Sequence, residues 1–132
     1  MKKWISKNLA GQLLIIFLSL LIVLHLFVLV KIVPPNFVWG GNIGGSLTRL
    51  YILEAISLLM TLIFLFIVIA KLRYSHWSRL NRLINIAIWI MFAYFVLNFI
   101  GNLASGVAVE KLIFAPITLL LALLTGRLAI EK

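Results

Sequence analysis

The segment TRLYILEAISLLMTLIFLFIVIAK, from Thr48 to Lys71, decides the fold because it is a nearly continuous apolar run of membrane-spanning length. An α-helix rises about 1.5 Å per residue, so about 20 residues cross a hydrocarbon layer about 30 Å thick. Glu54 lies inside this run and is the only acidic residue within an apolar run of the chain. A carboxylate is costly in hydrocarbon, so it usually has a polar partner and often a role. We therefore expect other helices to supply polar side chains that face Glu54.

The composition is that of an integral membrane protein. The 132 residues are 64% hydrophobic and 11% charged, with a mean hydropathy of +1.21, whereas soluble domains are about 45–50% apolar. Twelve lysines and arginines oppose three acidic residues, for a net charge of +9. In a soluble protein this excess would suggest nucleic acid, but on membrane loops it sets orientation and meets anionic lipid headgroups. We expect the lipid bilayer, and no nucleic acid, as a partner.

Four apolar runs predict four spanning helices, at about residues 12–33, 48–70, 83–103 and 112–130. Pro34 and Pro35 are expected to end the first, because proline lacks an amide donor and restricts the residue before it. A glycine-rich loop over residues 34–47 follows, with Ser46 as a plausible N-cap of the second helix. The predicted fold class is all-α, a transmembrane four-helix bundle formed by one membrane domain over residues 1–132.

The distribution of cations predicts the orientation of this bundle. The first and third loops hold Lys31, Arg49 and Lys111. The two termini and the second loop hold the other nine: Lys2, Lys3, Lys7, Lys71, Arg73, Arg79, Arg82, Arg127 and Lys132. Because cytoplasmic loops are enriched in lysine and arginine, both termini are predicted to be cytoplasmic, in the plasma (inner) membrane of a bacterium. Arg127, one turn from the end of the last helix, is expected to snorkel to the headgroups.

Polar residues from four different helices are expected to lie at similar depth. His25, Glu54, Asn98 and Thr118 each fall about 7 to 12 Å from the outer end of their predicted helix. Histidine and glutamate are rare within apolar runs. This agreement predicts a polar layer in the outer half of the bundle.

Helical spacing predicts which faces point inward, because residues three, four and seven apart share one side of a helix. Three stripes follow this spacing, one on each of the last three helices. Their members are Tyr51, Glu54, Ser57 and Thr61; then Tyr94, Asn98 and Asn102; and then the small residues Thr118, Ala122 and Gly126. Small residues allow close helix approach, so we expect all three stripes to face the interior.

Two readings of the polar layer stay open. In the first, the layer is a pocket in which a small amphipathic ligand or cation is bound or transported, with Glu54 as counter-ion and the glycine loop as a lid. The candidate binding residues are Glu54, Asn98, Asn102, His25, Tyr51, Thr118 and Trp39, although an interfacial anchor is the favoured reading of Trp39. In the second, the layer is only a buried hydrogen-bond network in a structural or accessory subunit. A proton-coupled role for Glu54 and His25 is a smaller alternative.

Signatures of enzymes and metal sites are absent from the sequence. The chain has no cysteine and no aspartate, and its two histidines, His25 and His76, are predicted on opposite sides of the membrane. A pair of carboxylates would require Glu54 with Glu110, which is predicted in a loop rather than in a span. We therefore expect a non-enzymatic protein without a metal or cofactor. A homo-oligomer or a larger membrane partner is possible, because four helices enclose little volume.

Several strings resemble those of small four-helix integral membrane proteins of bacteria to which no activity is assigned. They are Val38-Trp39-Gly40-Gly41, Tyr51 with Glu54, Asn98 to Ala104, and Glu110-Lys111 with Pro116 to Thr118. The resemblance covers nearly the whole chain and implies the four-span topology alone. Small multidrug resistance transporters are similar only in size and helix count. Their essential carboxylate lies in the first helix, which in this chain contains no acid.

Overall fold

A computed structural model of the chain describes residues 5–39, 46–74 and 78–131. The elements in order are α1 (Lys7–Leu29), η1 (Pro35–Phe37), α2 (Leu47–Arg73), α3 (Ser78–Ala104), η3 (Glu110–Phe114) and α4 (Ala115–Ala129). Within these residues four helices are long and apolar enough to cross a membrane, since η3 continues directly into α4. The predicted all-α architecture, with four helices of membrane-spanning length and hydropathy, is confirmed.

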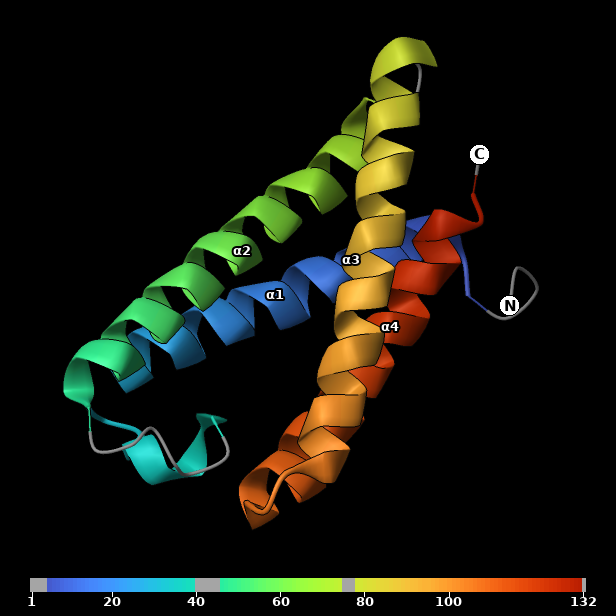
Figure 1. Ribbon diagram of the computed structural model, residues 1–132. Helices are drawn as coiled ribbons and strands as arrows, with labels where there is room; N and C mark the ends of the chain where they lie inside the picture. Colours follow the sequence, from blue (N-terminus) through green and yellow to red (C-terminus); the bar gives the residue numbers. More distant parts are fainter. Residues whose placement is uncertain (1–4, 40–45, 75–77, 132) are drawn as a thin grey trace.

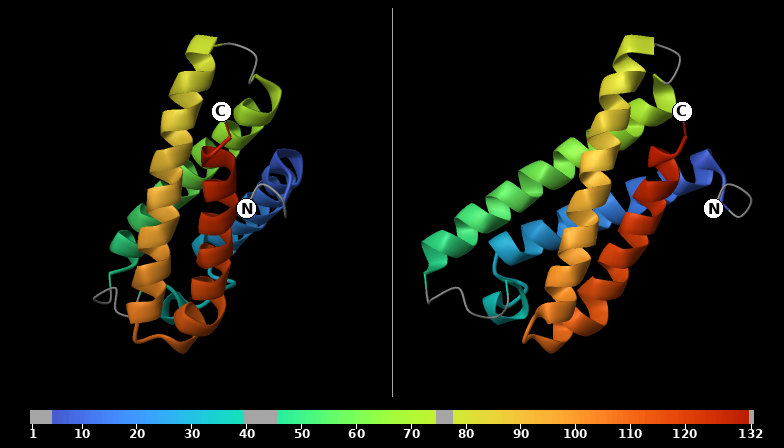
Figure 2. Two further views of the ribbon diagram at one scale, coloured as in Figure 1. Left: turned by 90° about the vertical axis from the view of Figure 1, so that its right-hand side faces the viewer. Right: turned by 45° about the vertical axis from the view of Figure 1, so that its right-hand side comes forward.

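The helices form two pairs that cross at an angle (Figure 1). In the first pair α1 packs along α2, and in the second α3 packs along α4, while α1 also contacts α4 and α2 contacts α3. The pairs come together near the start of α1 and the end of α4 (Figure 2). They separate at the opposite end, where η1 lies between them. The converging end holds the main apolar core, which includes Leu14, Val68, Ile88 and Leu121.

The bundle exposes many large apolar side chains and buries some ionisable ones. Large apolar side chains such as Phe66 and Leu112 are 71% and 76% exposed. Glu54 and Lys71, in contrast, are 2% and 0% exposed. Hydrocarbon solvates apolar side chains well and charged ones poorly. The surface is therefore that of a membrane protein.

The first helix differs from its predicted range of 12–33. It begins at Lys7, where the Ser6 hydroxyl caps it by accepting a hydrogen bond of 3.1 Å from the Leu9 amide. It ends at Leu29, before the two prolines, because Lys31 has a φ of 62° and the chain already turns there. Pro35 instead opens η1. The two prolines therefore mark the start of η1 rather than the end of α1.

The second and third helices run further than predicted at their cation-rich ends. α2 continues to Arg73 and α3 starts at Ser78, so much of the predicted loop is helical. Lysine and arginine are good helix formers, and a helix extends past the hydrocarbon without cost to its backbone hydrogen bonds. The predicted cap of α2 is correct, since the Ser46 hydroxyl accepts a hydrogen bond of 3.3 Å from the Arg49 amide.

The small-residue stripe on α4 lies at a helix contact, as predicted. Gly126 is buried, and a Cβ added to it would lie 3.1 Å from the Phe92 ring of α3. Gly101 on α3 is exposed and would meet nothing within 4 Å. We expect Gly126→Leu to destabilise the fold by about 1–3 kcal/mol, because the larger side chain must displace the ring. Unfolding by SDS titration in mixed micelles measures this cost, and Gly101→Leu is the matched control. Equal stability of the two variants would contradict the close α3–α4 contact.

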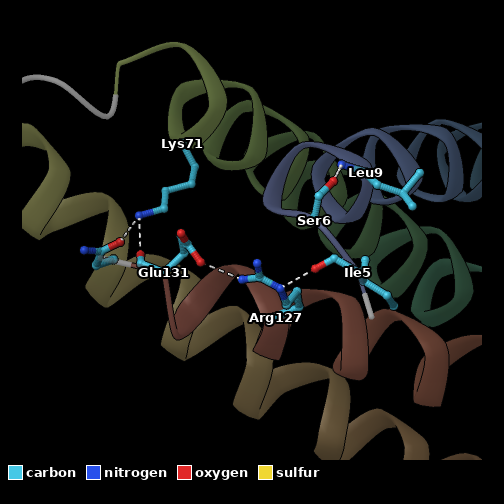
Figure 3. A network of polar contacts seen from close by, with 7 residues as sticks. Ile5, Ser6, Leu9, Lys71, Arg127 and Glu131 are labelled. Atoms are coloured by element: carbon cyan, nitrogen blue, oxygen red, sulfur yellow. Dashed lines mark hydrogen bonds and ion pairs between the residues drawn. The ribbon is translucent and has the colours of Figure 1, made fainter. Parts of the chain in front are cut away.

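A network of charged side chains joins the two pairs at their converging end (Figure 3). Lys71 of α2 donates to the side-chain oxygens of Asn81 and Asn85 on α3, and to the backbone oxygen of Glu131 at 2.9 Å. Its three ammonium protons are therefore matched by three neutral acceptors. Lys71 was predicted to begin a loop, but it lies within α2 and is fully buried.

Arg127 belongs to the same network. The prediction that its side chain snorkels to the headgroups is wrong. Arg127 is 4% exposed, and its Nε donates to the Ile5 backbone oxygen at 2.6 Å. Its Nη1 forms an ion pair of 2.7 Å with the Glu131 carboxylate, one turn along the chain. Figure 3 shows the guanidinium between Ile5 and Glu131. The guanidinium therefore makes these hydrogen bonds inside the protein rather than in the headgroup layer.

Candidate functional site

The Glu54 carboxylate is held by one side chain from α1 and one from the segment after η1. Its Oε2 lies 2.7 Å from Nδ1 of His25, and its Oε1 accepts a hydrogen bond of 2.7 Å from Nε1 of Trp39. The contact with His25 is an ion pair when the imidazole is protonated. His25 was one of several candidate partners, with Asn98, Thr118 and Tyr51, and the structure shows this contact. Each oxygen of the buried carboxylate thus has a polar partner.

The helix face that carries Glu54 is the predicted polar stripe of α2. Glu54, Ser57 and Thr61 are all buried, and the Thr61 hydroxyl donates to the Ser57 backbone oxygen at 2.7 Å. That local bond satisfies Thr61 without another helix. Tyr51, at the start of the stripe, is only partly buried and does not line the cavity described below. Its assignment as a binding residue is therefore not supported by its position.

Trp39 has a strained backbone and a specific partner. Its φ of 57° lies in the left-handed region, which bulky residues rarely occupy. The indole is 40% exposed, yet its N–H reaches the buried Glu54. The favoured expectation of an interfacial anchor missed this bond. A strained residue tied to a buried carboxylate is typical of a functional position.

A cavity of about 170 Å³, here called the Glu54 cavity, lies between the two helix pairs beside this carboxylate. Its walls come from α1, from the segment after η1, and from α2, α3 and η3. The lining residues are Leu21, Leu24, His25, Val28, Val38, Trp39, Glu54, Ser57, Thr61, Phe64, Tyr94, Phe95, Asn98, Asn102, Glu110 and Phe114. The diverging pairs in Figure 2 explain why space remains at this end of the bundle.

A wider and more open recess adjoins the Glu54 cavity. Its volume is about 500 Å³, and it shares five lining residues with the cavity: Trp39, Tyr94, Asn98, Asn102 and Glu110. These residues line both spaces, so the cavity and the recess meet there.

Glu110 is the second carboxylate of the cavity, and its predicted place in a loop was wrong. It begins the π-helical turn η3 and is 7% exposed. The first turn of a helix favours a negative charge, because unpaired backbone N–H groups point toward it. The predicted helix start at residue 112 excluded Glu110 from the span. The position of Glu110 immediately before an apolar run was the sequence feature that could have indicated its place in the helix.

The predicted amides and Thr118 take different positions relative to the cavity. Asn98 lines it and donates to the Tyr94 backbone oxygen at 2.9 Å rather than to Glu54. Asn102 also lines it and donates to the Thr118 hydroxyl at 3.3 Å. Thr118 does not line the cavity and supports Asn102 from α4. The polar layer therefore forms as two contact groups, Glu54 with His25 and Asn102 with Thr118.

Aromatic rings form the side of the cavity toward the main core. Phe64 of α2 lies 5.1 Å from Tyr94 and 5.6 Å from Phe95, measured between ring centroids, and both pairs meet edge to face. Such pairs hold their rings in defined orientations. The cavity is thus lined by packed aromatic rings and by two carboxylates, Glu54 and Glu110.

Comparison of the chain with protein-family models, with curated proteins and with solved structures gave no match. Over residues 5–39, 46–74 and 78–131, no group of three or more histidine, cysteine, aspartate or glutamate side chains is arranged to hold a metal ion. The glycines at positions 40, 41, 44 and 45, which were predicted to act as a lid, lie outside the described residues.

Proposed function

We propose that the protein is a non-catalytic, multi-pass protein of the bacterial inner membrane that binds or transports a small amphipathic ligand in the Glu54 cavity. The cation distribution supports a cytoplasmic location of both termini, which would place the cavity in the outer half of the membrane. The observation that carries the proposal is the cavity itself, in which a buried carboxylate and an aromatic wall face the same space.

The size of the cavity limits the ligand. An engineered apolar cavity of about 150 Å³ accommodates benzene, and the Glu54 cavity measures about 170 Å³. The part of a ligand that lies inside the cavity is therefore about the size of one substituted ring. Glu54, Asn98 and Asn102 would orient its polar group, and the aromatic wall would hold its apolar part.

The composition of the walls also supports binding. Carboxylates within membrane spans are costly and usually line a path or pair with another group. A purely structural network needs no cavity beside it, whereas Glu54 lines a cavity of about 170 Å³.

The second candidate is a structural or accessory subunit, either in a homo-oligomer or with a larger membrane partner. It is favoured by the satisfaction of polar groups, since no buried side-chain nitrogen or oxygen in the described part of the chain lacks a hydrogen-bond partner. In that case Glu54, His25 and Trp39 only hold the helices in register.

Filling the cavity separates the two candidates. Ser57 lines the cavity and Ser19 is exposed on α1. We expect Ser57→Leu to remove a co-purified ligand while folding is kept, because added methylenes occupy the ligand's space. Native mass spectrometry of the purified protein measures the bound mass, and Ser19→Leu is the control that should retain it. Identical spectra for wild type and both variants, without a bound mass, would favour the accessory subunit.

A further inference from the structure

The acidic residues of this chain are concentrated at one place. The chain has only three acidic residues against twelve lysines and arginines. Two of the three, Glu54 and Glu110, line the Glu54 cavity, and no lysine or arginine is among its described lining residues. The third, Glu131, is in the network with Arg127 at the converging end. A strongly basic protein therefore contains a cavity lined by two carboxylates and one histidine, without lysine or arginine among its described lining residues.

The same cavity is rich in aromatic side chains. Trp39, Phe64, Tyr94, Phe95 and Phe114 line it, from the segment after η1 and from α2, α3 and η3. The faces of aromatic rings attract cations, and rings gathered around one space recognise methylated ammonium groups in particular. Carboxylates and aromatic rings together are thus complementary to an organic cation rather than to a neutral or anionic molecule.

The hydrogen bonds of Glu54 distinguish between kinds of cation. Each of its oxygens already has a close partner, Trp39 on one and His25 on the other. A primary ammonium group gains most from directional hydrogen bonds, and at Glu54 it would have to share each oxygen with the partner already there. A quaternary ammonium group has no N–H and needs only nearby negative charge and aromatic faces. The geometry therefore favours the methylated cation.

We propose that the ligand of the Glu54 cavity carries a methylated ammonium group, held by Phe64, Tyr94 and Phe95 and balanced by Glu54 and Glu110. This inference rests on the proposed binding function and names the class of its ligand. The same chemistry occurs in free quaternary amines and in the headgroup of phosphatidylcholine. In either source, the methylated ammonium group is the part that would occupy the cavity of about 170 Å³.

The test uses the full-length protein in nanodiscs of phosphatidylethanolamine and phosphatidylglycerol, which contain no quaternary ammonium. Benzyltrimethylammonium, benzylammonium and benzyl alcohol are titrated by isothermal calorimetry. We expect the quaternary cation to bind about tenfold or more tightly than either of the others, in accordance with cation–π attraction at a desolvated site. Equal affinity of all three probes, blocked by Ser57→Leu, would overturn the inference and leave the binding function intact. Binding of none of them would overturn both.

Two variants on α2 test whether Phe64 contributes to the preference for the quaternary cation. Phe64 is 4% exposed and lines the cavity, whereas Phe66 is 71% exposed. Phe64→Leu is expected to reduce the preference for the quaternary cation over benzyl alcohol by about threefold or more, and Phe66→Leu to leave it unchanged. The ratio of affinities is the readout, so a general loss of stability does not imitate the effect. An unchanged ratio in Phe64→Leu with the fold intact would contradict the aromatic site.

Replacement of part of the lipid by phosphatidylcholine distinguishes the two sources of the methylated ammonium group, a free amine and a lipid headgroup. If the natural occupant is a lipid headgroup, the apparent affinity for benzyltrimethylammonium falls in proportion to the phosphatidylcholine content, and the inference is supported with a lipid ligand. If the affinity is unchanged while the selectivity holds, the inference is supported with a free amine.

Discussion

Glu54→Ala is expected to lower the free energy of unfolding by about 3 kcal/mol. The alanine leaves the Trp39 indole N–H and the His25 imidazole without their partner, where both now lie 2.7 Å from the carboxylate. Both contacts are made to a side chain that is only 2% exposed. SDS titration in mixed micelles, followed by circular dichroism, measures the change.

Glu54→Gln is the conservative comparison for this experiment. The amide oxygen can still accept from Trp39, so we expect a loss of only about 1 kcal/mol. A double-mutant cycle with His25→Ala should show a coupling energy of about 1 kcal/mol or more between Glu54 and His25. Additive effects would mean that the pair does not stabilise the fold.

Lys71→Leu is expected to destabilise the protein by about 2 kcal/mol, because three acceptors lose a charged donor at once. Those acceptors belong to Asn81, Asn85 and Glu131, so the substitution loosens α3 and the C-terminal segment from α2. The lysine is fully buried, so its replacement acts inside the protein rather than at the lipid surface.

Arg73→Leu is the matched control, since this cation lies on the same helix but is exposed. Exposed substitutions usually change stability by about 0.5 kcal/mol or less. The same SDS titration compares the two variants. If Lys71→Leu were no more destabilising than Arg73→Leu, the buried network would not hold the converging end together.

Much of the helical fold was predictable from local sequence. Apolar runs of about 20 residues located four helices, and the spacing of Glu54, Ser57 and Thr61 identified the buried face of α2. Similar depth on two helices made His25 one of the candidate partners of Glu54. Each of these predictions depends only on residues along one helix or on the distance of a residue from a helix end.

The errors occurred where a residue's environment depends on another element. Lys71 and Arg127 were read as cations of loops and headgroups, but crossing of the helix pairs buries both. Trp39 was read as an anchor, and Glu110 as a loop residue. Charge and aromatic character alone do not distinguish a side chain at the membrane surface from one in a polar interior.

By itself, the sequence determined that the chain forms four apolar helices and that α2 carries a carboxylate on its inward face, because hydropathy and helical periodicity are local properties. Only the tertiary structure decided that Trp39 and Glu110 join Glu54 around one cavity. That arrangement depends on two helix pairs that meet at one end and diverge at the other (Figure 2). The angle between packed helices is set by side-chain contacts across both pairs, which no single segment of sequence encodes.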